Sequence, residues 1–153
     1  MTQTPLKRRH LLACGLLLTS LNTWATKRPL VEVWKDPQCG CCTDWIVILQ
    51  KSGFDVRVND TGNAAARARL GIPEKLGSCH TARIEGYALE GHVPVRDIQR
   101  LLREKPRAIG LAVPGMPIGS PGMDGDIYNG RKDPYDVLLI AHDGTSKIYQ
   151  SYR

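Results

Sequence analysis

The cysteines are the residues best suited to chemistry, and the 153-residue chain has five of them. Three of these, Cys39, Cys41 and Cys42, fall within four residues of sequence. Thiolates attack disulfides and bind soft metal ions, and the positive end of a helix lowers the pKa of a thiol there. An alternating strand pattern over 30–34 precedes these cysteines, and a helical pattern follows Cys42. The cysteines are therefore expected where a strand turns into a helix.

Cys39 and Cys42 have the Cys-x-x-Cys spacing of thioredoxin-like oxidoreductases. Cys41 departs from that pattern, because a third thiol can scramble a disulfide that has to open and close. Three thiolates so close together suit a soft cation, or a small cluster of such cations with bridging sulfurs. Simple stapling is disfavoured, since closing so short a loop removes little chain entropy. These residues leave a metal site and a redox site open.

Cys79 and His80 directly precede a strand predicted to begin at Thr81. In a thioredoxin-like arrangement this segment faces the cysteine turn, which would bring a fourth sulfur and an imidazole to the site. The alternatives are a small buried residue for Cys79 and a polar loop residue for His80. His92 precedes a predicted helix and is either a ligand or a residue of the cap region.

Apart from the initiator, the only methionines are Met116 and Met123. Both lie in Gly/Pro-rich sequence instead of on an apolar stripe, where a core methionine usually sits. Thioethers are soft ligands, so this pair favours Cu(I) over zinc. The alternative is that each methionine folds into the core.

The elements around these residues alternate between strand and helix. Their order predicts an α/β fold with a thioredoxin-like βαβ–ββα core, an additional C-terminal β-hairpin and a long Gly/Pro/Met loop. The expected strands are 30–34, 54–58, 81–84, 87–89, 137–141 and 147–152, the expected helices follow Cys42, Asn63 and Pro94, and the loop is 113–134.

Residues 1–25 have the features of a signal peptide, with Lys7-Arg8-Arg9 before an apolar stretch and a small-x-small cleavage site ending at Ala25. The stretch is too short to span a bilayer, so no membrane anchor is expected after cleavage. Residues 26–153 are then expected to form one domain. Arg8-Arg9 also resembles a twin-arginine signal, which leaves both the Sec and the twin-arginine routes open. Either route predicts a periplasmic protein.

The formal net charge is +6, and three of the positive charges lie in the predicted leader. No basic stripe interleaved with aromatic residues follows, which disfavours nucleic-acid binding. The chain has no Gly-rich phosphate loop and no credible Ser/His/Asp set. Asp124, Asp126 and Asp133 lack the spacing of a hard-cation site.

Several short motifs follow one another in a characteristic order. They are Cys39-Gly-Cys-Cys42 with Trp45, Gly71-Ile-Pro73, Ser78-Cys-His-Thr81, Gly86-Tyr87, Glu90-Gly-His-Val-Pro94, Gly110-Leu-Ala-Val-Pro-Gly-Met-Pro117 and Gly119-Ser-Pro-Gly-Met123. Together they resemble a bacterial family of exported metal-binding proteins that includes the CopG-type periplasmic copper-resistance proteins. The resemblance covers essentially all of residues 26–153.

The resemblance implies a thioredoxin-like fold whose cysteine turn binds copper, including multinuclear Cu(I) clusters, and supports copper redox change. It implies copper ions and periplasmic copper-efflux or copper-carrier proteins as partners. The implied thiolate ligands are Cys39, Cys41, Cys42 and Cys79, with Met116, Met123 and His80 or His92 to complete or gate the site.

Three functions are left to compare. The first is a periplasmic protein that sequesters, transfers or redox-buffers Cu(I) and contributes to copper resistance, without turnover of an organic substrate. The second is a thiol-disulfide oxidoreductase with Cys39 as the attacking and Cys42 as the resolving thiol. The third is a structural zinc site with four cysteines, which leaves both methionines unexplained.

Overall fold

The structure is a computed structural model that describes residues 27–153. The signal peptide predicted for residues 1–25 lies outside the described residues. Within residues 27–153, no helix combines the length and the apolar character needed to cross a bilayer.

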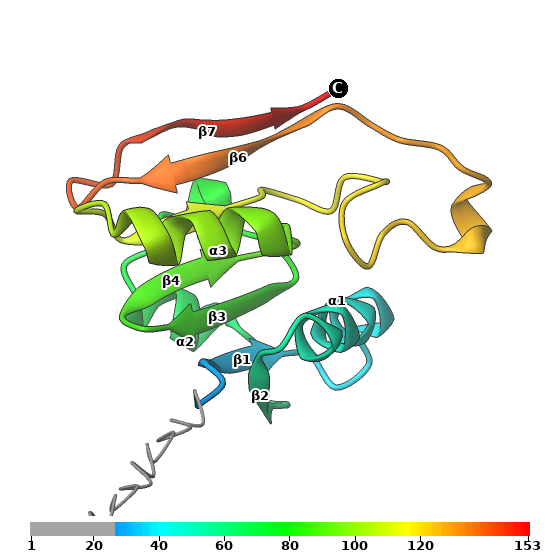
Figure 1. Cartoon of the computed structure of the whole chain (residues 1–153), viewed down its shortest axis with the longest axis horizontal. Coiled ribbons are helices and arrows are strands. Elements are labelled where there is room, and N and C mark those ends of the chain that lie inside the picture. The colour runs from blue at the N-terminus through cyan, green and yellow to red at the C-terminus, as the bar shows by residue number, and fades with distance from the viewer. Residues whose placement is uncertain (1–26) are drawn as a thin grey trace, which may run out of the picture.

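Seven strands form one mixed sheet with the order β2-β1-β3-β4-β5-β6-β7 (Figure 1). β1 is parallel to β2 and β4 is parallel to β5, whereas the other neighbouring strands are antiparallel. The α/β class predicted from the sequence is therefore confirmed. The strands are β1 (Leu30–Lys35), β2 (Asp55–Asn59), β3 (His80–Ile84), β4 (Tyr87–Glu90), β5 (Gly110–Ala112), β6 (Tyr135–Ile140) and β7 (Ser146–Tyr152).

Three α-helices of the described chain cover the two faces of this sheet. In Figure 1, α3 lies in front of the strands and α2 lies behind them. The helices are α1 (Gly40–Lys51), α2 (Ala64–Arg69) and α3 (Val95–Glu104), with short 3₁₀ helices η1 (Glu74–Leu76) and η2 (Asp126–Tyr128).

The hydrophobic core follows the alternation of side chains along each strand. Leu89 and Leu111 pack in the larger cluster, which also holds the buried residues of α1 and α3. Their neighbours Ala88 and Ala112 pack in a second cluster with Leu76. β4 and β5 are thus covered on both faces, which fixes their register in the sheet.

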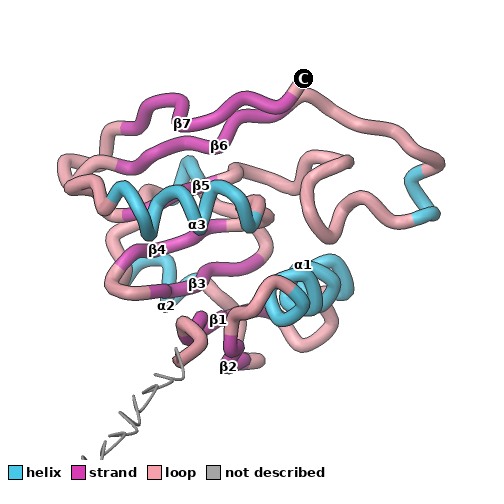
Figure 2. Tube along the Cα trace, viewed as in Figure 1, coloured by secondary structure: helices cyan, strands magenta, loops and turns pink. Residues whose placement is uncertain are grey.

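One strand was missed by the sequence-based expectation. β5 was not predicted, because three residues are too few to show an alternating pattern. It fits between β4 and β6 only because Gly110 has no Cβ, which would clash with the Ala88 carbonyl. The segment 113–134 is irregular as predicted, and η2 is its only helical turn (Figure 2).

Candidate metal centre

Hydrogen bonds to Asp36 shape the cysteine turn, the segment that carries Cys39, Cys41 and Cys42. The Cys39 amide donates to the Asp36 carbonyl (3.0 Å), and the Gln38 amide donates to the Asp36 carboxylate (2.9 Å). The helix α1 begins at Gly40, earlier than the pattern after Cys42 indicated. Cys39 is consequently the N-cap residue, and Cys41 and Cys42 lie in the first turn, where backbone N–H groups have no intrahelical acceptor.

Cys39 and Cys42 are joined by a disulfide, whereas Cys41 and Cys79 are free. The sequence disfavoured stapling in this turn, because the closed loop is very short. The structure pairs these two cysteines nonetheless, since the first turn of α1 brings residues three apart onto one side. Cys42 is fully buried and Cys39 is half-buried, so Cys39 is the more accessible sulfur of the pair.

Cys79 comes from a distant part of the sequence to the same place. It precedes β3, and β3 pairs with β1, the strand that leads into the cysteine turn. The Cys39 and Cys41 sulfurs are 3.6 Å apart, and the Cys42 sulfur is 3.8 Å from the Cys79 carbonyl oxygen. All four sulfurs lie within 4.8 Å of one another.

Two buried histidines flank Cys79. Its sulfur is 3.1 Å from His92 Nε2 and 3.4 Å from His80 Nδ1. His92 Nδ1 lies 2.8 Å from the Pro121 carbonyl, which can only accept, so Nδ1 carries the proton and Nε2 presents its lone pair toward Cys79. His80 Nε2 is buried and has no hydrogen-bond partner among the described residues.

The surroundings keep these groups uncharged in the metal-free protein. Burial, with the neighbouring His92, lowers the pKa of His80 to about 3. Burial also lowers the pKa of His92, against the Pro121 hydrogen bond and the charge of Asp124. Burial, with the charge of Cys41, raises the pKa of the Cys79 thiol to about 12. Neutral imidazoles are ready to coordinate a metal, whereas a metal must displace the proton of Cys79.

The two methionines differ in their surroundings. Met123 is almost buried, and its sulfur accepts a hydrogen bond from the Tyr128 hydroxyl (3.3 Å). Met116 has 51% of its side-chain surface exposed. Among the described residues, no hydrogen bond joins either methionine sulfur to a cysteine or histidine.

The loop 113–134 nevertheless packs against the cysteine turn. A Cβ on Gly122 would lie 2.6 Å from the Cys41 carbonyl oxygen and 2.9 Å from the Trp45 amide nitrogen. Pro121, one residue earlier, accepts the hydrogen bond from His92. The loop therefore meets both halves of the site.

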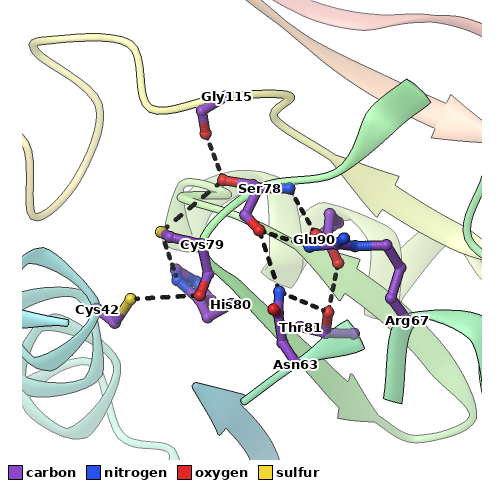
Figure 3. Close-up of polar contacts among 9 residues, drawn as sticks. All are labelled: Cys42, Asn63, Arg67, Ser78, Cys79, His80, Thr81, Glu90 and Gly115. Atoms are coloured by element: carbon purple, nitrogen blue, oxygen red, sulfur yellow. Dashed lines mark hydrogen bonds and ion pairs between the residues drawn. The ribbon is translucent and has the colours of Figure 1, made fainter. Parts of the chain in front are cut away.

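The sequence did not point to the polar residues behind Cys79. Glu90, Arg67, Thr81 and Asn63 form a hydrogen-bonded group around the Ser78 backbone (Figure 3). In the sequence, Glu90 is a single acidic residue at the end of an apolar strand, and that position was the only signal for it.

Trp45 is a second residue for which no functional role was predicted. Its indole N–H donates to the Val93 carbonyl (2.9 Å), and its ring lies 4.4 Å from the His80 ring, centre to centre. The indole packs against His80 and helps to shield it from water, and His80 is fully buried.

The donor set fits a soft metal ion. Four sulfurs and two imidazoles converge in a partly buried place, and Cys79 belongs to both the four-cysteine group and the Cys79-His80-His92 group. The buried, unpartnered nitrogen of His80 is a further sign of a ligand site, because such an atom otherwise costs stability. Sulfur and imidazole donors together suit copper and zinc, and a sulfur-rich set favours Cu(I).

The fold and the site define an α/β protein with a cluster of cysteines and histidines that could hold a metal ion. The family described as "Protein of unknown function, DUF411" matches residues 76–123, the segment from η1 to Met123. Comparison with curated proteins gives no match.

Two solved structures resemble the whole fold. One, described as copper resistance protein CopG, Form 2, is 41% identical with a TM-score of 0.76, and the match covers 83% of this chain and 100% of that chain. Form 1 of the same description is 42% identical with a TM-score of 0.76, and covers 82% and 98%. The chain belongs to the family of CopG copper resistance proteins.

Proposed function

We propose that this protein binds copper as Cu(I) at the cysteine turn and contributes to copper resistance by sequestering, transferring or redox-buffering the ion. The observation that carries the proposal is the convergence of four cysteine sulfurs, from segments far apart in sequence, within 4.8 Å of one another. The likeness to structures described as copper resistance proteins supports copper as the ion.

The proposed ligands are the thiolates of Cys39, Cys41, Cys42 and Cys79, with His92 and His80 beside them. Sulfurs so close together suit bridging, which supports a multinuclear Cu(I) cluster. Met116 and Met123 complete or gate the site through loop movement, and the exposure of Met116 supports a role in passing copper to a copper-carrier or copper-efflux protein.

The disulfide supports redox buffering as part of this function. Two Cu(II) ions each take one electron from the Cys39 and Cys42 thiolates, which join as the disulfide, and two Cu(I) ions result. The reverse reaction regenerates the thiolates. The reduced Cys39–Cys42 pair thus stores two electrons at the proposed copper site.

A thioredoxin-like core is the architecture we propose for this site. The succession β1-α1-β2 followed by β3-β4-α3, with the strands in the order β2-β1-β3-β4, supports it. The predicted leader supports periplasmic export, and the disulfide suits that oxidising compartment.

The disulfide also favours a second function, thiol-disulfide exchange. The Cys39 thiolate would attack a partner disulfide, and Cys42 would then close the intramolecular disulfide and release the partner's two thiols. The greater exposure of Cys39 than of Cys42 suits this order of attack.

Elemental analysis of anaerobically purified protein separates these functions. We expect at least one copper ion per chain in the wild type and in His142→Gln, whose side chain is exposed in the closing hairpin, and loss of copper in Cys39→Ser. Zinc in place of copper would contradict the proposal. So would metal-free protein that reduces insulin disulfides with Cys39 and Cys42 alone.

A further inference from the structure

The carboxylate of Glu90 is fully buried behind Cys79 and accepts three hydrogen bonds. The donors are Arg67 Nε (2.8 Å), the Ser78 amide (2.6 Å) and the Thr81 hydroxyl (2.6 Å) (Figure 3). Ser78 and Thr81 bracket the Cys79-His80 pair in sequence. The carboxylate therefore holds the backbone on both sides of two proposed ligands.

The carbonyl of Ser78 is fixed as firmly as its amide. It accepts hydrogen bonds from Arg67 Nη2 (2.6 Å) and from Asn63 Nδ2 (3.1 Å). Arg67 thus contacts both Glu90 and Ser78, which makes the ion pair a clamp on the residue before Cys79. Because β3 begins only at His80, Ser78 lies outside the strand pairing. Side chains hold its backbone instead.

Two glycines make room for this clamp. A Cβ on Gly77 would lie 3.0 Å from the Arg67 guanidinium carbon. A Cβ on Gly91 would lie 2.5 Å from the Ser78 hydroxyl oxygen, and the φ of Gly91, +69°, is itself unfavourable for other residues. The backbone before Ser78 and after Glu90 thus leaves room for the clamp.

Ser78 also connects the clamp to the methionine-bearing loop. Its hydroxyl donates to the Gly115 carbonyl, one residue before Met116, and lies 3.9 Å from the Cys79 sulfur. The same residue thus touches the clamp, a proposed ligand and the loop.

We propose that the pair of the buried Glu90 and the partly buried Arg67 is a positioning device for the metal site, which fixes Ser78 so that the Cys79 sulfur faces the cysteine turn and His92. This inference rests on the function proposed above. A buried ion pair is a weak source of stability, since apolar residues of equal volume stabilise about as well. Holding a ligand in a set geometry is a use that an apolar replacement cannot supply.

Cu(I) competition titrations of Glu90→Gln test this role, because the substitution keeps the side-chain shape and removes the charge. Losing a residue that orients a metal ligand lowers metal affinity roughly 10- to 100-fold, and we expect a fall in that range. Glu32→Gln is the matched control, since Glu32 pairs with Arg83 at 2.9 Å on the exposed side of the sheet. The control should bind Cu(I) like the wild type.

The same substitution in a Cys79→Ser background separates positioning from general destabilisation. If Glu90 acts through Cys79, Glu90→Gln should have no further effect on Cu(I) affinity once that sulfur is gone. A full additional fall in the double variant would overturn the inference. Wild-type affinity in Glu90→Gln would overturn it as well.

Hydrogen exchange of the metal-free protein gives a readout that does not depend on copper. Glu90→Gln should speed exchange of the Ser78 amide at least severalfold, while amides of β1 stay unchanged. Unchanged Ser78 exchange would refute the clamp even if the protein binds copper, and faster exchange would support it even if the wild type binds none. If Glu90→Gln fails to fold, Thr81→Val removes one hydrogen bond of the same carboxylate and should show the same changes, smaller in size.

Discussion

His92 shows how a backbone contact sets the tautomer of a proposed metal ligand. The Pro121 carbonyl holds the proton on Nδ1, so that Nε2 faces Cys79 at 3.1 Å without having to change tautomer. Burial keeps the ring neutral by lowering its pKa, so a metal ion need not displace a proton from it. Only Cys79 must lose its proton when the two residues bind a metal together.

His92→Gln should therefore lower Cu(I) affinity about tenfold or more, because the amide is a poorer donor for a soft ion. Competition with a coloured Cu(I) chelator measures the change in the reduced protein. His142→Gln is the matched control and should leave the affinity unchanged, since His142 is exposed in the turn between β6 and β7. Equal affinities for all three proteins would remove His92 from the site.

The oxidation state of Cys39 and Cys42 should set how much copper the protein holds. Sulfurs joined in a disulfide are no longer thiolates, so the oxidised protein keeps only Cys41 and Cys79 as free thiols within residues 27–153. Anaerobic Cu(I) titration before and after reduction should show greater uptake in the reduced form. Equal uptake by both forms would show that these two sulfurs are not ligands.

At the residue scale, the sequence predicted which residue types carry the chemistry better than it predicted the contacts those residues make. Cys79 and His80 lie beside the cysteine turn as predicted, and His92, for which a ligand and a cap-region role were both left open, joins them. The pairing of Met123 with the Tyr128 hydroxyl was beyond the sequence, because an irregular loop has no period from which the direction of a side chain follows. The role of Glu90 was hidden for another reason, since a single acid at a strand end normally faces water.

Among the elements, the loop 113–134 packs closely on α1 because Gly122 has no side chain. Gly122 has a φ of +86° and lies against the Cys41 carbonyl and the Trp45 amide, so a Cβ there has no free space. Its contact explains how an irregular segment can be attached to the cysteine turn. The loop and α1 are thereby packed together at Gly122.

Gly122→Ala should destabilise the metal-free protein by about 1–3 kcal/mol, from backbone strain and overpacking. Urea unfolding at neutral pH measures this change. Gly125→Ala is the matched control, because Gly125 has a φ of −69° and no atom within 4 Å of its ideal Cβ position. A substitution at Gly122 as harmless as that at Gly125 would contradict the packing of the loop on α1.

The closing hairpin should make stability sensitive to alkaline pH. Burial, with the charges of Asp97 and Asp124, raises the pKa of Tyr135 from 10.0 to about 12. Above pH 10 the unfolded chain loses this proton first, so stability present below pH 10 is lost as the pH rises toward 12. Tyr135→Phe should show a smaller fall in the free energy of unfolding over this range, measured by denaturant titration at each pH. Parallel falls in both proteins would contradict the shift.

The elements themselves were largely predictable. β1 alternates clearly, β6 contains a short apolar run, and α3 begins after Pro94 as expected. The start of α1 and the existence of β5 were not, because the first turn of a helix and a three-residue strand carry too few residues to show a period. It was the first of these that decided which cysteines lie inside the helix.

Across the whole molecule, the sheet order is what assembles the site. Placing β3 beside β1 brings Cys79 to the cysteine turn, and β4 beside β3 brings His92 behind it. The loop after β5 then returns over α1 to contact His92. The sequence supplied the order of these elements, whereas the distances between their ends depend on long-range packing that no local pattern encodes.

X-ray absorption at the copper edge of the anaerobically Cu(I)-loaded protein tests the central claim most directly. The account predicts a copper environment dominated by sulfur, with an imidazole contribution that weakens in His92→Gln and a sulfur contribution that weakens in Cys79→Ser. Copper surrounded mainly by nitrogen and oxygen, and unaffected by either substitution, would contradict it.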